Sequence, residues 1–91
     1  MFTYIITNHI NSVFYTGVTN NLERRIQEHR LGIFNNSFSK KYRLYKLIWF
    51  QEFNNPLEAI TAEKKIKGWK RNRKIEMIKE INPDLGEIKL N

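Results

Sequence analysis

The chain has 91 residues, which is enough for one compact domain and too few for two. It has no cysteine, so disulfide bonds, thiolate metal sites and cysteine nucleophiles are excluded. The longest apolar run, residues 47–50, is too short to cross a bilayer, and Met1 leads directly into strand-like sequence. We therefore expect a cytoplasmic protein.

The charge of the chain is strongly positive and unevenly distributed. Sixteen Lys and Arg against nine Asp and Glu give a net charge of +7, which is typical of proteins that bind nucleic acids. Residues 63–80 alone hold eight of the bases and three of the acids. A basic segment is often only a solvated surface, but its concentration around Trp69 favours phosphate contacts. The cations that we expect to contact nucleic acid are Lys40, Lys41, Arg43, Lys67, Lys70, Arg71, Arg73 and Lys74.

Two strands are expected at the start of the chain. Residues 2–7 and 13–18 are rich in β-branched and aromatic residues, and residues 8–11 have the composition of a hairpin loop. With that loop, antiparallel pairing places Tyr4 directly opposite Tyr15, on the same face of the sheet. A change of one residue in loop length would send the two rings to opposite faces.

A helix follows the second strand at once. Asn20 is the expected N-cap with Glu23 completing a capping box, and Gly32 is the expected end. Arg25 and His29 are four residues apart, so they share one helix face beside the apolar stripe.

The middle of the chain predicts a loop and a third strand. Residues 34–44 are polar and basic without a clear period, which indicates a loop. Residues 45–53 are apolar on both faces at their centre, which predicts a strand in the interior of the sheet.

Two more helices are expected after the third strand. Asn55 and Pro56 are a strong helix start, and Gly68 ends or kinks that helix. Isoleucines at 75, 78 and 81 predict a final helix that stops before Pro83. The element order β-β-α-β-α-α, without a glycine-rich phosphate loop, predicts a small α+β fold.

Few residues in the chain can carry chemistry, and they form a short set: Tyr4, Tyr15, Arg25, His29 and Glu63. This set is sufficient for phosphodiester hydrolysis. One carboxylate can hold a single Mg²⁺ that keeps several waters, a guanidinium can stabilise phosphorane charge, and Tyr or His can take a proton. Glu63 is the most telling member, because its spacing places a carboxylate within the apolar stripe of its helix.

Each of these residues also has a purely structural interpretation. The two tyrosines can be amphipathic strand residues with their hydroxyls at the rim of the core. Arg25 can pair with Glu28, Glu63 can pair with Lys67 one turn later, and His29 can be a packed imidazole.

The combination of these residues resembles the GIY-YIG nuclease superfamily. The resemblance rests on Phe2-Thr3-Tyr4, Tyr15-Thr16-Gly17, the 21–25 segment, His29 and Glu63, and it extends over approximately residues 1–81. The chain is most similar to small stand-alone members of the superfamily, which are akin to the catalytic domain of the nucleotide-excision-repair endonuclease.

The chain departs from the family pattern at three places. Phe2-Thr3-Tyr4 matches the first name-giving triplet only at its tyrosine, and Val18 stands where some members carry a lysine. Asn72 is the nearest counterpart of a late asparagine of the family.

The resemblance implies a three-stranded antiparallel sheet flanked by helices, in a single domain over 1–91 with a core to about residue 81 and a C-terminal tail over 82–91. It also implies hydrolysis of DNA phosphodiesters with one Mg²⁺ or Mn²⁺. The implied roles are water activation by Tyr4, Tyr15 and His29, phosphate binding by Arg25, metal ligation by Glu63, a motif glycine at Gly17 and an unassigned role for Asn72.

Two other functions stay open. The chain could be a nucleic-acid-binding module that keeps the nuclease scaffold but cleaves little or not at all. A structural basic protein would explain the charge but not the placement of Glu63. DNA is the expected partner, including branched, flapped or damaged DNA in a repair context, and RNA stays open as well.

Overall fold

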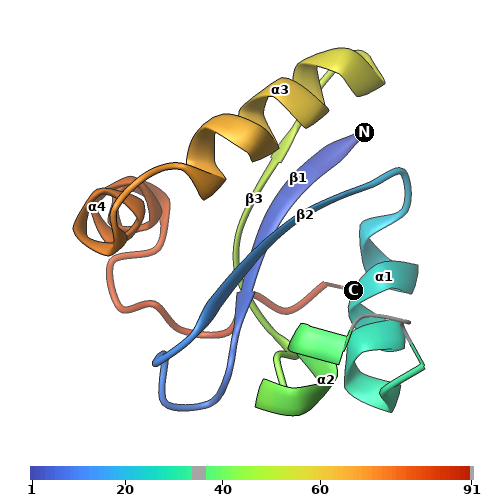
Figure 1. Ribbon diagram of the computed structural model, residues 1–91, viewed down its shortest axis with the longest axis vertical. Coiled ribbons are helices and arrows are strands. Elements are labelled where there is room, and N and C mark those ends of the chain that lie inside the picture. Colours follow the sequence, from blue (N-terminus) through green and yellow to red (C-terminus); the bar gives the residue numbers. More distant parts are fainter. Residues whose placement is uncertain (34–36, 91) are drawn as a thin grey trace.

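The computed structural model describes residues 1–33 and 37–90, which form an α+β fold around one antiparallel sheet (Figure 1). Its elements are β1 (Phe2–Thr7), β2 (Phe14–Thr19), α1 (Leu22–Leu31), α2 (Ser37–Tyr42), β3 (Lys46–Glu52), α3 (Pro56–Lys67) and α4 (Arg71–Ile81). The predicted fold class and three-stranded antiparallel sheet are confirmed. Within the described residues, none of the helices has the length and apolarity needed to span a membrane.

The strand order is β2-β1-β3, so the first strand is the central one. The prediction that the third strand lies in the interior of the sheet is therefore wrong. β3 is apolar on both faces because helices cover the two faces of the sheet and the C-terminal segment follows its outer edge. There the backbone N–H of Ile88 donates to the carbonyl of Leu47 at 2.8 Å.

The pairing of β1 with β2 differs from the predicted register by two residues. Tyr4 lies opposite Gly17, and Tyr15 lies opposite Ile6. Direct pairing of Tyr4 with Tyr15 was therefore wrong. A shift of two residues preserves the alternation of side chains, so both tyrosines still lie on the same face of the sheet.

The cause of the shift is a hairpin loop longer than the composition indicated. The Asn8 carboxamide accepts a hydrogen bond from the Ser12 backbone N–H at 2.8 Å and donates to the Ser12 hydroxyl at 2.7 Å. Asn11 adopts a left-handed conformation with φ of 58°, which asparagine tolerates better than most residues. These contacts close the loop around residue 8, so that β2 begins at Phe14 rather than at residue 13.

Two apolar clusters lie on opposite faces of the sheet. The first is formed by Tyr4, Ile6, Leu22, Ile26, Leu44 and Leu47, and the second by Ile5, Ile48, Trp49, Ile66 and Ile78. Figure 1 shows α1 and α2 on one side of the sheet and α3 and α4 on the other. A β-bulge, in which Ile48 is the extra residue of β3, lets consecutive residues of that strand join the second cluster.

Helix α1 begins one residue later than predicted. Asn21, not Asn20, is the N-cap, because its side-chain oxygen accepts the Arg24 backbone N–H at 3.0 Å. Asn20 lies in the bend after β2, where its side chain accepts the Arg24 guanidinium at 3.3 Å. The predicted end of this helix is confirmed, since Gly32 has a left-handed φ of 70°.

Of the predicted loop over 34–44, residues 37–42 form the short helix α2, so this prediction was wrong for that part, and residues 34–36 lie outside the described residues. The fully buried Leu44 follows α2 and ties it to the first cluster, a tertiary contact that the polar sequence of the segment does not indicate. Helix α3 begins as predicted, with Asn55 as its N-cap and Pro56 in its first turn, and it ends at Gly68.

The C-terminal segment is bound to the rest of the fold. The Asn82 side chain donates to the carbonyls of Ile48 at 2.9 Å and Gly86 at 2.8 Å. Glu87 forms an ion pair with Arg30 of α1, and Ile88 packs against the first cluster. The predicted tail thus holds α1 against the sheet; Asn91 lies outside the described residues.

The cap of α1 gives a direct test of this geometry. Asn21→Ala should lower the free energy of unfolding by about 1 kcal/mol, because it leaves a helix N-terminal N–H without its acceptor. Asn20→Ala is the matched control and should change it by less than about 0.5 kcal/mol. Urea unfolding of both variants checks this; equal losses at the two positions would contradict the assigned cap.

Candidate active site

Tyr4 is the buried centre of the candidate site. Its side chain is fully buried on the central strand, and its ring lies across Gly17 of β2. A Cβ atom at Gly17 would lie 2.5 Å from the Tyr4 hydroxyl oxygen, which is shorter than any tolerable contact. Glycine is therefore needed at position 17 because of the close approach of this ring, not because of a special φ angle.

Three aromatic rings form a contiguous cluster around this point. The Tyr4 hydroxyl and His29 Nε2 are 3.1 Å apart, which is hydrogen-bond distance. The ring centroids are separated by 6.4 Å for Tyr4–Tyr15, 5.9 Å for Tyr4–His29 and 5.8 Å for Tyr15–His29. The structure thus brings together two predicted residues of the sheet and one of α1.

The imidazole of His29 is neutral at physiological pH. Burial lowers the pKa of His29 to about 4, and the nearby Arg25 guanidinium acts in the same direction, while Glu28 opposes the shift. A neutral imidazole keeps one nitrogen as an acceptor. His29 can therefore accept the Tyr4 hydroxyl proton in a hydrogen bond.

The two tyrosines have different surroundings. Burial raises the pKa of the Tyr4 phenol above its ordinary value, Tyr15 adds to this shift, and the Arg25 guanidinium opposes it. Tyr4 is therefore a neutral phenol held within the core. Tyr15 is only half-buried, so its ring borders the surface of the protein.

Arg25 lies in the first half of α1, at the rim of the cluster. Its Nε atom donates to the Glu28 carboxylate at 3.0 Å, so the structural interpretation of this residue is also realised. The charge of Arg25 nevertheless acts on both Tyr4 and His29. This i,i+3 ion pair is partly exposed, so a phosphate that arrives from solvent can compete for the guanidinium.

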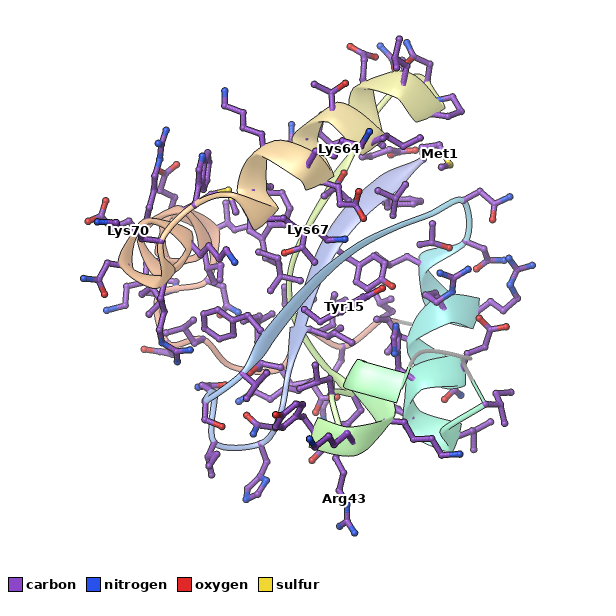
Figure 2. All side chains as sticks on the ribbon, in the orientation of Figure 1. Met1, Tyr15, Arg43, Lys64, Lys67 and Lys70 are labelled. Carbon is purple, nitrogen blue, oxygen red and sulfur yellow. The ribbon has the colours of Figure 1, made fainter. Side chains whose placement is uncertain are left out.

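Glu63 approaches the cluster from α3. Its side chain is 18% exposed, and Lys67 Nζ lies 3.0 Å from one carboxylate oxygen. The same ammonium lies 5.9 Å from the centroid of the Tyr15 ring. Although α3 packs on the opposite face from α1, it reaches Tyr15 because β2 is an edge strand. Figure 2 shows Lys67 extending from α3 towards Tyr15.

The residues around Glu63 fit a divalent metal ion only if most of its ligands are not protein side chains. Among the described residues, no group of three or more His, Cys, Asp or Glu side chains could hold a metal. A largely buried carboxylate can bind one Mg²⁺-like ion that keeps several waters and takes phosphate oxygens as further ligands. Such an ion would bind weakly to the protein alone.

A basic hollow of about 340 Å³ borders His29. It is lined by His29, Arg30, Leu31, Gly32, Lys40, Arg43 and Tyr45. Two of the predicted phosphate-binding cations, Lys40 and Arg43, therefore lie on the α2 side of the candidate site. The third cation of this segment, Lys41, lies over the Tyr42 ring, with 5.4 Å from Nζ to the centroid.

The predicted cations of α4 form a separate group. Arg71 donates to the carbonyls of Ser12 and Asn11 and lies 4.4 Å from the Phe14 ring centroid, so it ties α4 to the hairpin loop. Figure 1 places α4 well away from α2. Seven of the eight predicted cations thus form two surfaces rather than one, and the eighth, Lys67 of α3, lies beside Tyr15.

The other members of the α4 group differ in exposure. Arg73 stacks on Trp69, with 4.2 Å from its guanidinium carbon to the ring centroid, and Lys74 is half-buried. Lys70 is exposed at the N-terminus of the helix. Asn72 is exposed in the first turn of α4 and, in the described part of the chain, has no hydrogen bond to the ring cluster.

Comparison with known proteins identifies the family. The sequence-family model of the GIY-YIG catalytic domain matches residues 1–76 of the chain. The chain belongs to the GIY-YIG family. This confirms the resemblance drawn from the two tyrosine triplets, and it places the chain in a nuclease superfamily.

Several small GIY-YIG relatives are similar over nearly their whole length. The UPF0213 protein CPE1444 of Clostridium perfringens is 40% identical, over 85% of this chain and 84% of its own. UPF0213 protein SH2523 of Staphylococcus haemolyticus is 35% identical, over 87% and 94%. A UPF0213 protein of Pediococcus pentosaceus is 30% identical, over 97% and 92%. No solved structure matches the chain.

Two features of this GIY-YIG domain were not foreseen from the sequence. One is the approach of Tyr4 to Gly17, and the other is the contact between the Tyr4 hydroxyl and His29. Both depend on the two-residue register shift, which the loop chemistry of Asn8 sets. The signal for that loop was an asparagine followed four residues later by serine.

The burial of a neutral His29 makes stability depend on pH. Its folded pKa of about 4 lies below its unfolded value of 6.5, so the unfolded chain binds a proton first as pH falls. The stabilisation is complete above about pH 6.5 and should fall by about 1.5 kcal/mol between about pH 6.5 and 5. Urea unfolding at several pH values measures this slope.

Two histidine variants test whether His29 causes this dependence of the free energy of unfolding on pH. His29→Gln keeps a hydrogen-bonding side chain but cannot titrate, so its stability should be nearly flat over this range. His9→Gln alters the other histidine, which is exposed in the hairpin loop, and should keep the slope of the parent. An identical slope in the parent and in His29→Gln would contradict a buried neutral imidazole.

Proposed function

We propose that this GIY-YIG domain is a metal-dependent endonuclease that hydrolyses DNA phosphodiester bonds. The observation that carries the proposal is the convergence of groups from four elements, β1, β2, α1 and α3, at the edge of the sheet. The Tyr4–Tyr15–His29 rings are in mutual contact, and Lys67 lies near Tyr15 and pairs with Glu63. The charges of Arg25 and Glu63 both act on Tyr4, and that of Arg25 also acts on His29.

Tyr15 is the proposed proton acceptor for the attacking water. Its ring borders the surface and is within reach of solvent, whereas Tyr4 is fully buried and its phenol is held neutral. Tyr4 and His29 are assigned to orientation, since their hydrogen-bonded contact holds α1 against the sheet behind Tyr15. This favours Tyr15 over Tyr4 as the base, whereas the resemblance implied water activation by both.

Arg25 is the proposed ligand of the scissile phosphate. A guanidinium can donate two hydrogen bonds to phosphate oxygens and stabilise the charge that develops on them in the transition state. Glu28 competes for this guanidinium in the free protein. Lys40 and Arg43 of the adjacent hollow would bind neighbouring phosphates of the same strand.

Glu63 is the proposed ligand of one Mg²⁺ or Mn²⁺. When bound, such an ion polarises the phosphoryl group and helps to ionise water. The chain contributes a single carboxylate, and substrate phosphate and water would complete the shell. Branched, flapped or damaged DNA are the candidate substrates.

A second candidate function is nucleic-acid binding without cleavage. It is favoured by the two ion pairs, because Glu28 holds Arg25 and Lys67 holds Glu63. In that case the basic surfaces would bind phosphates, and the ion pairs would only stabilise the helices.

Glu63→Gln separates the two functions. It keeps the size of the side chain and removes its charge, so metal-dependent cleavage of plasmid, flapped and branched DNA should fall by at least about 100-fold. Binding to the same DNA should be unchanged or tighter, because a negative charge near phosphate is removed. Cleavage with and without Mg²⁺ or Mn²⁺, and binding measured in Ca²⁺, check the two expectations.

Arg25→Ala is the matched variant on the α1 side of the site. It should lose cleavage to a similar degree and also lose DNA affinity, because a phosphate contact disappears. Failure of the parent protein to cleave any duplex, flapped, branched or single-stranded DNA with either metal would overturn the nuclease proposal in favour of the binding module.

A further inference from the structure

Lys67 is the expected ion-pair partner of Glu63, one turn later on α3, and in the structure it also reaches Tyr15. Among the described residues it forms the only ion pair of Glu63, at 3.0 Å, and its ammonium lies within 6 Å of the Tyr15 ring centroid. Its neighbour Lys64, on the same helix, is exposed and takes part in no ion pair in the described part of the chain. Lys67 therefore pairs with Glu63, whereas Lys64, three residues earlier on the same helix, does not within the described residues.

The carboxylate that Lys67 neutralises is the less exposed partner of the pair. The Glu63 side chain is 18% exposed and the Lys67 side chain 50%. Removing a carboxylate from water is costly unless a positive charge accompanies it. The flexible and more exposed lysine can leave, whereas the carboxylate stays where the helix holds it.

We propose that Lys67 is the internal counter-ion of Glu63 and competes with the divalent metal for this carboxylate. The inference rests on the proposed function, since it assigns the metal to Glu63. In the metal-free protein the Lys67 ammonium contacts the Glu63 carboxylate and lies within 6 Å of the Tyr15 ring centroid. When a metal binds, the ion and the ammonium repel each other at close range, so the ammonium is displaced.

The displaced ammonium remains beside Tyr15, where the next available anion is a phosphate of the substrate. Metal binding therefore converts Lys67 from a partner of Glu63 into a phosphate ligand, and bound DNA in turn favours metal binding. The two effects must be equal in size, because coupling between two ligands is reciprocal. Lys67 thus regulates the site by coupling the metal to the nucleic acid.

The first test is titration with Mg²⁺ alone, followed by NMR at the backbone amide of Glu63. Lys67→Met removes the competing charge and should lower the Mg²⁺ dissociation constant by about threefold or more. Lys64→Met removes the same charge from the same helix without breaking the pair, so it should change the constant much less. Lys67→Arg keeps a cation and should bind Mg²⁺ like the parent.

The outcomes separate this inference from the function on which it rests. Tighter Mg²⁺ binding in Lys67→Met alone supports the inference. Equal binding by the parent, Lys67→Met and Lys64→Met, with Mg²⁺ still acting at Glu63, overturns the counter-ion role and leaves the metal site standing. Indistinguishable titrations of the parent and Glu63→Gln overturn both. Urea unfolding of Lys67→Met checks that the fold is retained.

The second test is DNA binding with and without a divalent ion. Lys67→Met should weaken binding to a duplex more in Ca²⁺ than in EDTA, because only the displaced ammonium is available to phosphate. Lys70→Met is the control, since Lys70 is exposed and in no ion pair within the described residues, and its loss should be the same in both buffers. Equal losses for Lys67→Met in both buffers would overturn the coupling.

Discussion

The fit of the Tyr4 ring against Gly17 is the contact on which the candidate site depends. It can form only because position 17 has no side chain, since a Cβ atom would lie 2.5 Å from the Tyr4 hydroxyl oxygen. The ring then places its hydroxyl 3.1 Å from His29 Nε2 and so fixes where α1 meets the sheet. Arg25, one turn before His29 on the same helix, is positioned by the same contact.

The second constraint is that β2 lies at the edge of the sheet. Helices on opposite faces cannot normally share a site, because the sheet separates them. At an edge strand α3 reaches Tyr15 from the far side, which brings Glu63 and Lys67 into the same site as Arg25. The site therefore combines a cation from one layer with a carboxylate from the other, and each is held by a weak ion pair in the free protein.

Much of the fold could be predicted because local rules determine it. The Gly32 end of α1 and the Asn55 start of α3 depend only on backbone chemistry of the nearest residues. The central position of β1, the helix at 37–42 and the hairpin register could not be predicted, because each depends on distant partners or on loop closure. The tyrosines still share a face only because the register error was an even number of residues.

In the proposed nuclease, Glu63 and the tyrosine cluster form one metal-dependent site for a DNA phosphate. The most direct measurement is a crystal structure of the Tyr15→Phe variant with uncleaved DNA and Mn²⁺, in which anomalous scattering locates the metal. We expect one manganese ion on the Glu63 carboxylate, a backbone phosphate as a further ligand, and Arg25 on that same phosphate. A structure with DNA bound only along α4, and with no manganese at Glu63, would contradict it.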